Sequence, residues 1–460
     1  MVKKRIRLIQ DNLVLVVLII FLIVQTLSFF SPADVWWDSS VYIGMGKFIY
    51  SFGEAGLWEA SRPIVWPVIL GFFWKFHLDQ IFFGKLTLLL FSLACILLTY
   101  LIAKRSFNAT IGLLSAIFLA FSQTFFLFAT VLHAEIPSLF FTLLGLYLFI
   151  KKKYSISGLF FGIAFMTRFF SIFAVLPIFS YLVFKSIKEK KKSLDLFIFS
   201  IYLLMPVALF LALNKFLYDN ILYPFVLQLY MAKNTGFVFY QLFYFYFFGL
   251  IKENMFAVFS ILGIVYILLR KNNLQVLLFF IFLFAFIPFS LAAHKEMRFL
   301  LLSLPLLYVL TAYGLTNFLS LFGKKQKIIL CSVILLWFLY TAPQLKFNQY
   351  DDGFNAFYDY IKNTRIGDQL WISNPAFIVY SDYKASLLYY PAFNLDKIQE
   401  LETKILGAKH VLINSCDLYC EPYFKDCEER KADFIGFLKT KFKIVFYEKK
   451  EECENYIFRK

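Results

Sequence analysis

The chain has 460 residues, of which 60% are hydrophobic and 17% are charged, and its mean hydropathy is +0.70. This composition excludes a soluble globular protein and predicts a polytopic helical membrane protein. Residues 1–344 hold 29 Lys and Arg against 12 Asp and Glu, whereas residues 345–460 hold 17 against 18. The net charge of +16 therefore lies in the apolar part, where it indicates membrane topology and not a nucleic-acid partner.

Apolar runs dominate the sequence as far as Pro343, and charged residues, Asn and Tyr return after it. We therefore predict two domains, a polytopic membrane domain over residues 1–343 and a soluble domain over residues 344–460. The first apolar run is about 18 residues long and no cleavage signal follows it, so we expect a retained membrane helix. Nine candidate spans cover residues 13–30, 80–103, 110–130, 136–150, 194–213, 254–269, 274–293, 298–320 and 327–342.

Basic clusters give these spans an expected orientation. Positive residues mark cytoplasmic loops, so the N-terminal "KKRIR" is placed in the cytoplasm. The loop over residues 31–79 and the C-terminal domain are then extracytoplasmic, on the cell membrane or, in a eukaryote, on the ER membrane. The later basic clusters all fall on the cytoplasmic side, at residues 104–105, 151–153, 270–271 and 324–325.

One apolar segment, residues 157–185, has lysine clusters on both sides, and both favour the cytoplasm. A single crossing would leave one cluster outside, so we predict two half-length helices that bend near Thr167 and Arg168. A hairpin of two short spans is the nearest variant. Arg168 is then a charge at membrane depth, and such residues are functional candidates.

The C-terminal domain is expected to be a small α/β domain. The segments "QLWIS", "HVLINS" and "KIVFYEKK" predict strands, and helices are expected near residues 353–363 and 396–406. An oxidising compartment would pair its cysteines as disulfides, whereas a zinc site is the alternative, with poor spacing and no nearby histidine. These cysteines are Cys416, Cys420, Cys427 and Cys453.

Three polar groups fall on the predicted outer side. Asp38 directly precedes "SSVYIGMGKFIYSF", whose apolar spacing predicts an amphipathic helix on the membrane surface. His133 and Glu135 lie in "HAEIP", and "HKEMRF" places a histidine, an acid and two cations between apolar runs. Plainer explanations are a helix cap for Asp38, a hydrated turn for the second group and headgroup contact for Arg62. The third group requires partners at this depth.

These same stretches resemble the GT-C type of membrane glycosyltransferases, which take sugars from polyprenyl-phosphate carriers. Asp38 with Tyr42, followed by "GLWEASRP", is similar to their first-loop signature, and "GLFFGIAFMTRFF" is similar to a glycine-rich helix with a basic residue. "AAHKEMRFLLLSLPLL" resembles a segment of the dolichyl-phosphate-mannose-dependent mannosyltransferases of N-glycan and GPI-anchor assembly. The C-terminal domain looks more like prokaryotic relatives. The family often has two adjacent acids in the first loop, but Ser39 follows Asp38 here, which leaves Glu135 as a possible replacement.

The resemblance covers roughly residues 10–343 and implies a fold and a reaction. The implied fold is membrane all-α, a GT-C-like bundle of about 9–11 transmembrane helices with a large first external loop. The implied reaction is inverting transfer of a hexose, mannose-like by the third motif, from a polyprenyl-phosphate-linked donor to a glycolipid, glycan or protein acceptor. A transporter or flippase of a lipid-linked anion is the alternative.

The implied chemistry assigns roles to residues on the outer side. Asp38 would be the catalytic base for the acceptor hydroxyl, and cations would bind the leaving phosphate. No cofactor is required, although a divalent ion held by His133 and Glu135 is a weaker alternative. The donor-phosphate candidates are Arg298, Lys295, Arg168 and Arg62; the substrate-binding or orienting candidates are Tyr42, Glu59, His294, Glu296, His133, Glu135 and Lys85.

Overall fold

The structure is a computed structural model, and it divides the chain into two compact units that are described separately. The helical unit comprises residues 1–32, 85–223 and 239–348, and the mixed unit comprises residues 33–84, 224–238 and 349–460. The boundary does not follow the order of the chain, because the first loop and the C-terminal segment share one unit. The described residues are 2–30, 35–189, 194–235, 240–348, 370–388, 398–420, 426–450 and 452–460.

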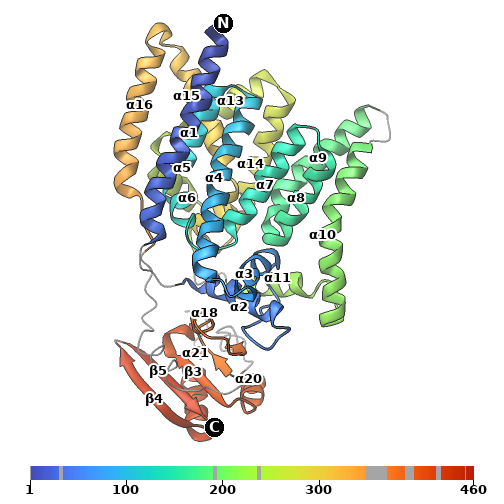
Figure 1. The fold of residues 1–460 in the computed structure, drawn as a ribbon, viewed down its shortest axis with the longest axis vertical. Coiled ribbons are helices and arrows are strands. Elements are labelled where there is room, and N and C mark those ends of the chain that lie inside the picture. Colours follow the sequence, from blue (N-terminus) through green and yellow to red (C-terminus); the bar gives the residue numbers. More distant parts are fainter. Residues whose placement is uncertain are drawn as a thin grey trace. The chain divides into compact units, whose positions relative to one another are not determined.

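The helical unit consists of apolar helices (Figure 1). Among the described residues of the chain, six segments are long and apolar enough to cross a bilayer, and there are six shorter apolar helices, of which one, Val65–Lys75, belongs to the mixed unit. The predicted polytopic membrane fold is confirmed. The α-helices are α1 (Val2–Phe29), α4 (Gln80–Ser106), α5 (Ala109–Ala120), α6 (Gln123–Phe128), α7 (Glu135–Ile150), α8 (Tyr154–Thr167), α9 (Ile172–Lys188), α10 (Leu194–Tyr218), α12 (Phe245–Glu253), α13 (Phe259–Arg270), α14 (Asn273–Leu291), α15 (Leu304–Ser320) and α16 (Gln326–Thr341).

A helix lies at each of the nine predicted spans, but three of them are not continuous. The span over residues 110–130 is divided between α5 and α6, because the helix stops at Phe121 and restarts after Ser122. The spans over residues 254–269 and 298–320 begin as 3-10 turns before α13 and α15. The 3-10 segments of this unit are η1 (Phe169–Ser171), η2 (Met255–Val258), η3 (Met297–Leu302), η4 (Gly323–Lys325) and η5 (Ala342–Gln344).

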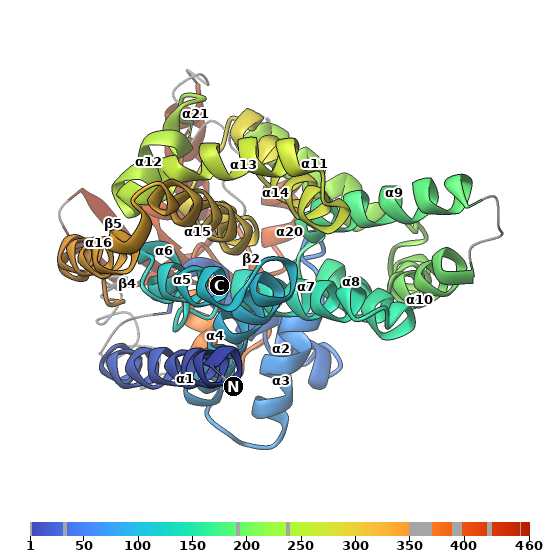
Figure 2. The ribbon, with the colours of Figure 1, turned by 90° about the horizontal axis from the view of Figure 1, so that it is seen from above.

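Figure 2 shows the helices of this unit from one end. Helix α8 packs between α7 and α10, and α9 packs against α14. Helix α15 packs against α5 and α13. Small residues allow the closest approach: a Cβ atom on Gly158 would lie 2.3 Å from the carbonyl oxygen of Phe199, so α8 and α10 meet through a glycine.

The predicted bend at Thr167 and Arg168 is confirmed. Helix α8 ends at Thr167, Arg168 is extended with φ −155° and ψ 119°, and α9 follows after η1. The Ala164 carbonyl oxygen accepts the amide of Arg168 at 2.9 Å, the last bond of α8, and it also accepts the Ser171 hydroxyl at 3.1 Å. Because its proton is used there, Ser171 accepts from the Ser138 hydroxyl at 2.6 Å. The break is therefore tied to α7 through Ser138.

The mixed unit contains a five-stranded sheet in the order β2-β1-β3-β5-β4 (Figure 1). Strands β2, β1 and β3 are parallel, and β5 is antiparallel to both β3 and β4. The three predicted strands are confirmed as β1, β3 and β4, and the helix expected near 396–406 is α20. The helix expected near 353–363 lies outside the described residues. The strands are β1 (Leu370–Ile372), β2 (Ala385–Leu387), β3 (His410–Asn414), β4 (Lys443–Lys450) and β5 (Cys453–Arg459); the helices that follow the first loop are α11 (Tyr223–Thr235), α18 (Ala376–Val379), α20 (Ile398–Ile405), η6 (Ser415–Asp417) and α21 (Cys427–Lys441).

The four cysteines of this domain form two disulfides, Cys416–Cys453 and Cys420–Cys427. The prediction that these cysteines form disulfides is confirmed, and the thiolates that a zinc ion would need are used in these bonds.

The first loop forms two helices, α2 (Trp37–Tyr50) and α3 (Val65–Lys75), which pack against each other. The predicted helix is confirmed as α2, but the exposed side expected of an amphipathic helix is wrong. Every residue from Ser39 to Lys47 is buried, because α2 packs against α18 as well as α3. An amphipathic surface helix would leave one side exposed.

Candidate functional site

The predicted site residues form two clusters, one in each unit. The arginine cluster lies in the helical unit and consists of His133, Glu135, Arg168, His294, Glu296 and Arg298. The Asp38 cluster lies in the mixed unit and consists of Asp38, Tyr42, Glu59, Ser61 and Arg62.

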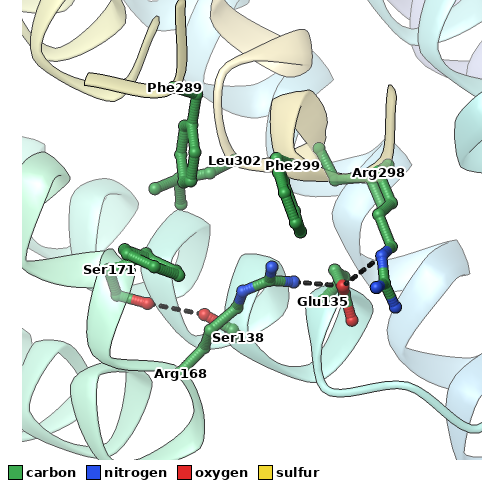
Figure 3. A pocket seen from close by; sticks show the side chains of 10 residues that line it. Glu135, Ser138, Arg168, Ser171, Phe289, Arg298, Phe299 and Leu302 are labelled. Carbon is green, nitrogen blue, oxygen red and sulfur yellow. Dashed lines mark hydrogen bonds and ion pairs between the residues drawn. The ribbon is translucent and has the colours of Figure 1, made fainter. Parts of the chain in front are cut away.

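Glu135 is the centre of the arginine cluster (Figure 3). It is the first residue of α7 and is 6% exposed, and its carboxylate forms an ion pair with Arg168. The same carboxylate oxygen lies 3.8 Å from Nε of Arg298, the second residue of η3. The broken helix and the 3-10 turn thus bring two guanidinium groups, far apart in sequence, to one buried acid.

Arg298 has two further partners. One of its terminal nitrogens donates to Oε1 of Glu296 at 2.8 Å, and the other donates to Nδ1 of His133 at 3.1 Å. A guanidinium can only donate, so Nδ1 accepts and His133 carries its proton on Nε2. His133 is therefore neutral, and its 3.8 Å separation from Glu135 is not an ion pair.

Glu296 also accepts a hydrogen bond from Nε2 of His294 at 2.7 Å. Burial acts to raise the pKa of Glu296, but the His294 hydrogen bond and the charge of Arg298 outweigh it and lower the pKa to about 2. The carboxylate is ionised at neutral pH, and it fixes the orientation of Arg298.

Beside the two arginines lies a pocket with one polar and one apolar wall (Figure 3). Phe299, in the apolar wall, contacts the polar wall, because its ring centre lies 5.3 Å from the Arg168 guanidinium and 5.4 Å from that of Arg298. The polar wall consists of Glu135, Ser138, Arg168, Ser171 and Arg298, and the apolar wall consists of Phe170, Phe289, Phe299, Leu301 and Leu302. Phe299 is the last residue of "HKEMRF", but its contact with Arg168 was not predicted, because the two residues lie far apart in the sequence.

Lys295 and Lys85, two further predicted site residues, contact main-chain carbonyl groups and belong to neither cluster. The Lys295 ammonium is buried and donates to the carbonyl oxygens of Gln241 at 2.7 Å and Ala292 at 2.5 Å. It joins the segment before α12 to the segment after α14. Nζ of Lys85 lies 3.5 Å from the carbonyl oxygen of Phe29, at the end of α1.

Arg62 joins two acids in the Asp38 cluster. It donates to Oδ1 of Asp38 at 2.8 Å and to Oε1 of Glu59 at 2.9 Å, and Ser61 donates to the same Glu59 oxygen at 2.8 Å. Its guanidinium also lies 5.4 Å from the ring centre of Tyr42. Burial acts against this cation, but the charges of Asp38 and Glu59 outweigh it and raise the pKa of Arg62.

The structure also tests the two simpler explanations, a helix cap for Asp38 and headgroup contact for Arg62. The cap position of α2 is Trp36 and Asp38 lies in the first turn, so a capping role for Asp38 is excluded by its position. Arg62 binds two carboxylates and its side chain is 21% exposed, which differs from the headgroup contact considered for it. Glu59 is a second first-loop acid bound to Arg62, whereas Glu135, considered as a replacement for the second acid, pairs with Arg168 in the arginine cluster.

No group of three or more His, Cys, Asp or Glu side chains that could hold a metal is found in the described part of the chain. Of the two proposed metal ligands, Glu135 is occupied by the arginines. His133 accepts from Arg298 through Nδ1.

Comparison with known proteins gives one partial sequence match and several similar structures. The family model described as dolichyl-phosphate-mannose-protein mannosyltransferase matches residues 61–210. No protein with a curated description matches the sequence. ArnT from Cupriavidus metallidurans, solved bound to undecaprenyl phosphate, has a TM-score of 0.64 at 11% identity over 96% of this chain and 97% of that one. The archaeal oligosaccharyltransferase AglB from Archaeoglobus fulgidus, solved with an inhibitory peptide and a dolichol-phosphate, has a TM-score of 0.63 at 10% identity over 97% of this chain and 74% of that one.

At these identities the structural likeness shows the fold. The chain is a multi-pass membrane protein with the fold of the GT-C type of polyprenyl-phosphate-dependent glycosyltransferases. The resemblance and the fold class predicted from the sequence are both confirmed.

Proposed function

We propose that this protein transfers a hexose, mannose-like in kind, from a polyprenyl-phosphate-linked donor to a hydroxyl of a glycolipid, glycan or protein acceptor on the extracytoplasmic side of the membrane. The fold and the match to a mannosyltransferase model over residues 61–210 support this class of reaction. The basic clusters of the short loops support the orientation.

The observation that carries the proposal is the pairing of Arg168 and Arg298 on opposite sides of Glu135, beside an apolar wall. Two guanidinium groups suit a phosphate, because each presents several N–H donors in a plane. Among the described residues, Glu135 is the one ion-pair partner of Arg168, so its other N–H groups can bind an anion. The apolar wall with Phe289 suits the first prenyl units of the donor.

Two carboxylates hold the arginines in place before the donor arrives. Glu135 lies next to both guanidiniums, and Glu296 binds Arg298. The two acids balance the two cations, so the cluster is not strongly charged when the pocket has no phosphate. Such preorganised donors stabilise the charge that develops on a leaving phosphate without having to reorient during the reaction.

In the proposed reaction, Asp38 takes the proton of the acceptor hydroxyl. The hydroxyl oxygen forms a bond to the anomeric carbon while the bond from that carbon to the donor phosphate breaks. The phosphate leaves with both electrons of that bond, and its new charge is stabilised by Arg168 and Arg298. Direct displacement inverts the anomeric centre, and it requires one carboxylate base and no covalent intermediate. Because the donor is already activated by its phosphate, we propose that no soluble cofactor takes part.

Arg62 would keep Asp38 ionised, because a cation at 2.8 Å favours the charged form of a carboxylate. Glu59 would hold Arg62 in turn.

The test uses the purified full-length protein in lipid nanodiscs with synthetic polyprenyl-phosphate-linked mannose, glucose or galactose. We expect transfer from one of these donors, and we expect Arg298→Ala to weaken donor binding by about tenfold or more. Arg298→Lys should restore binding only partly, because the planar fork is lost. Arg270→Ala is the matched control, since Arg270 ends α13 next to Asn317 and Tyr313. Unchanged donor affinity in folded Arg298→Ala protein would remove this site from the proposal.

A further inference from the structure

The first loop and the C-terminal segment form one hydrophobic core within the mixed unit. The first-loop residues Val41, Met45 and Leu57 are at most 1% exposed, and they pack in one cluster with residues of the sheet and of α18. Trp37, which precedes Asp38, is partly buried against the same cluster. Helix α2 is thus part of the core of the C-terminal domain.

Main-chain hydrogen bonds join the same two segments. The amide of Gly56 donates to the carbonyl oxygen of Tyr383 at 3.0 Å, and the amide of Ala385 donates to the carbonyl oxygen of Gly56 at 2.9 Å. Gly56 therefore lies beside β2, on the edge of the sheet opposite β4. Its φ of +83° and the carbonyl oxygen of Gly44, 2.2 Å from the site of a Cβ atom, require glycine here.

Lys47 adds a buried charge to this junction. Its side chain is 4% exposed, and Nζ lies 3.0 Å from Oδ1 of Asp382. The ammonium also donates to three carbonyl oxygens at and after the end of α18, those of Ile378 at 3.0 Å, Val379 at 3.2 Å and Ser381 at 2.9 Å. Carbonyl groups at a helix end lack helical partners and favour a cation. Lys47 therefore holds the end of α18 from the side of α2.

Asp382 receives a second hydrogen bond, from Nε1 of Trp74 on α3 at 2.9 Å. Both first-loop helices are thus attached to the segment between α18 and β2. Burial lowers the pKa of Lys47 although Asp382 opposes this. An apolar side chain of similar size would fill the same space without the free-energy cost of burying a charge. Filling the core therefore does not explain why a lysine stands here.

We propose that the C-terminal domain positions Asp38 for the reaction, and that Lys47 is the positioning residue through which it holds α2. This inference rests on the proposed function of Asp38. Lys47 follows Asp38 by nine positions of the same helix, or about 13 Å along its axis. Because a helix of this length is stiff, fixing one end of α2 fixes the other, and a displacement of about 1 Å at a reacting group can greatly reduce turnover.

The test compares Lys47→Met and Lys47→Arg with the wild type in the full-length protein. Lys47→Met keeps the length of the side chain and removes the charge, whereas Lys47→Arg keeps donors for the carbonyl groups. The matched control is Lys75→Met, because Lys75 is an exposed lysine on α3. Each protein is assayed for kcat, for the KM of the donor, for the pH dependence of kcat, and for hydrogen exchange of the α2 amides.

We expect Lys47→Met to lower kcat by about tenfold or more, with the donor KM within about twofold of wild type because the arginine cluster is unchanged. The α2 amides should exchange faster. The acid limb of the kcat profile should move to higher pH, because a displaced α2 weakens the Asp38–Arg62 pair. Lys47→Arg should restore part of each property, and Lys75→Met should match the wild type.

Three results would overturn the inference: wild-type kcat with protected α2 amides in Lys47→Met, faster exchange throughout the molecule, or an equal loss with no shift of the acid limb. The second and third would assign Lys47 a general structural role. If the wild type transferred no sugar from any donor, the proposed function would fail instead. The exchange of α2 would still report whether Lys47 holds the helix.

Discussion

Glu135 forms an ion pair with Arg168, and the first residue of α7 thereby holds the residue that directly follows α8. We expect Glu135→Gln to reduce the free energy of unfolding by about 3 kcal/mol, because two guanidinium groups lose their buried counter-charge. Turnover should also fall. Thermal unfolding in detergent checks this, with Glu189→Gln, an exposed acid at the end of α9, as the control. Equal unfolding of the two variants would mean that the ion pair contributes little.

Phe299 lies beside both guanidinium groups, so its ring should matter for donor binding. A cation–π contact contributes about 0.5–2 kcal/mol. We therefore expect Phe299→Leu to weaken donor binding by about two- to thirtyfold, whereas Phe299→Tyr should retain most of the affinity. Binding of a polyprenyl phosphate, measured by calorimetry, is the readout. The ring would have no such role if Leu and Tyr gave the same affinity.

The Asp38→Asn variant tests whether Asp38 acts as the base or has only a structural role. Asparagine keeps the size of the side chain but cannot accept the proton, so turnover should fall by about a hundredfold or more while donor binding persists. Asp79→Asn is the matched control, because Asp79 accepts hydrogen bonds from the amides of Ile81 at 2.8 Å and Phe82 at 3.0 Å at the start of α4. Asparagine can replace it in that capping role. Near wild-type turnover in Asp38→Asn would exclude the base.

Glu296 should make the stability of the protein depend on pH. Its pKa is about 2 in the folded protein against an ordinary value of 4.5, and its side chain is 24% exposed. A lowered pKa adds stability that is present above about pH 4.5 and is lost as the pH falls through about 2, on the order of 3 kcal/mol in all. Glu296→Gln should remove this part of the acid dependence. Parallel unfolding curves for wild type and variant between pH 4.5 and pH 2 would contradict the assignment.

The orientation can be tested with single cysteines in a Cys331→Ser background, since Cys331 is an exposed free cysteine. A membrane-impermeant maleimide should label Lys443→Cys, in exposed strand β4, in intact cells. It should label Lys324→Cys, in η4, only after permeabilisation. Both positions are exposed. The reverse pattern would place the C-terminal domain in the cytoplasm and reject the proposed side of the reaction.

The helices were predictable because apolar length and basic clusters are local properties of a membrane sequence. The break at Arg168 followed from two lysine clusters that both favour one side. Strand β5 was not predicted, because its short run "CENYIFR" begins with polar residues and does not alternate. The exposure of α2 was predicted incorrectly, because a spacing pattern records which residues are apolar and not which neighbours cover them.

The types of residue in the site could be predicted from the sequence, but which of them contact one another could not. The motif "HKEMRF" indicated cations and an acid that need partners. In the structure Arg298 contacts Glu135 and His133, and Glu296 accepts a hydrogen bond from His294. Arg298 contacts His133 across 165 positions of sequence, and no local pattern encodes such a separation. Lys295 carried the same charge as Arg298 but binds main-chain carbonyls instead. Charge alone does not distinguish the two residues.

The core shared by the first loop and the sheet determines the order in which the protein can be completed during synthesis. More than 300 residues separate Leu57 from Leu370, and a ribosome adds about 5–20 residues per second. The apolar side chains of α2 must therefore wait for roughly 15–60 s until the strands that cover them emerge. During this interval all helices of the helical unit except α1 are made. The mixed unit is consequently the last part of the protein to fold, although it contains some of the first residues to be translated.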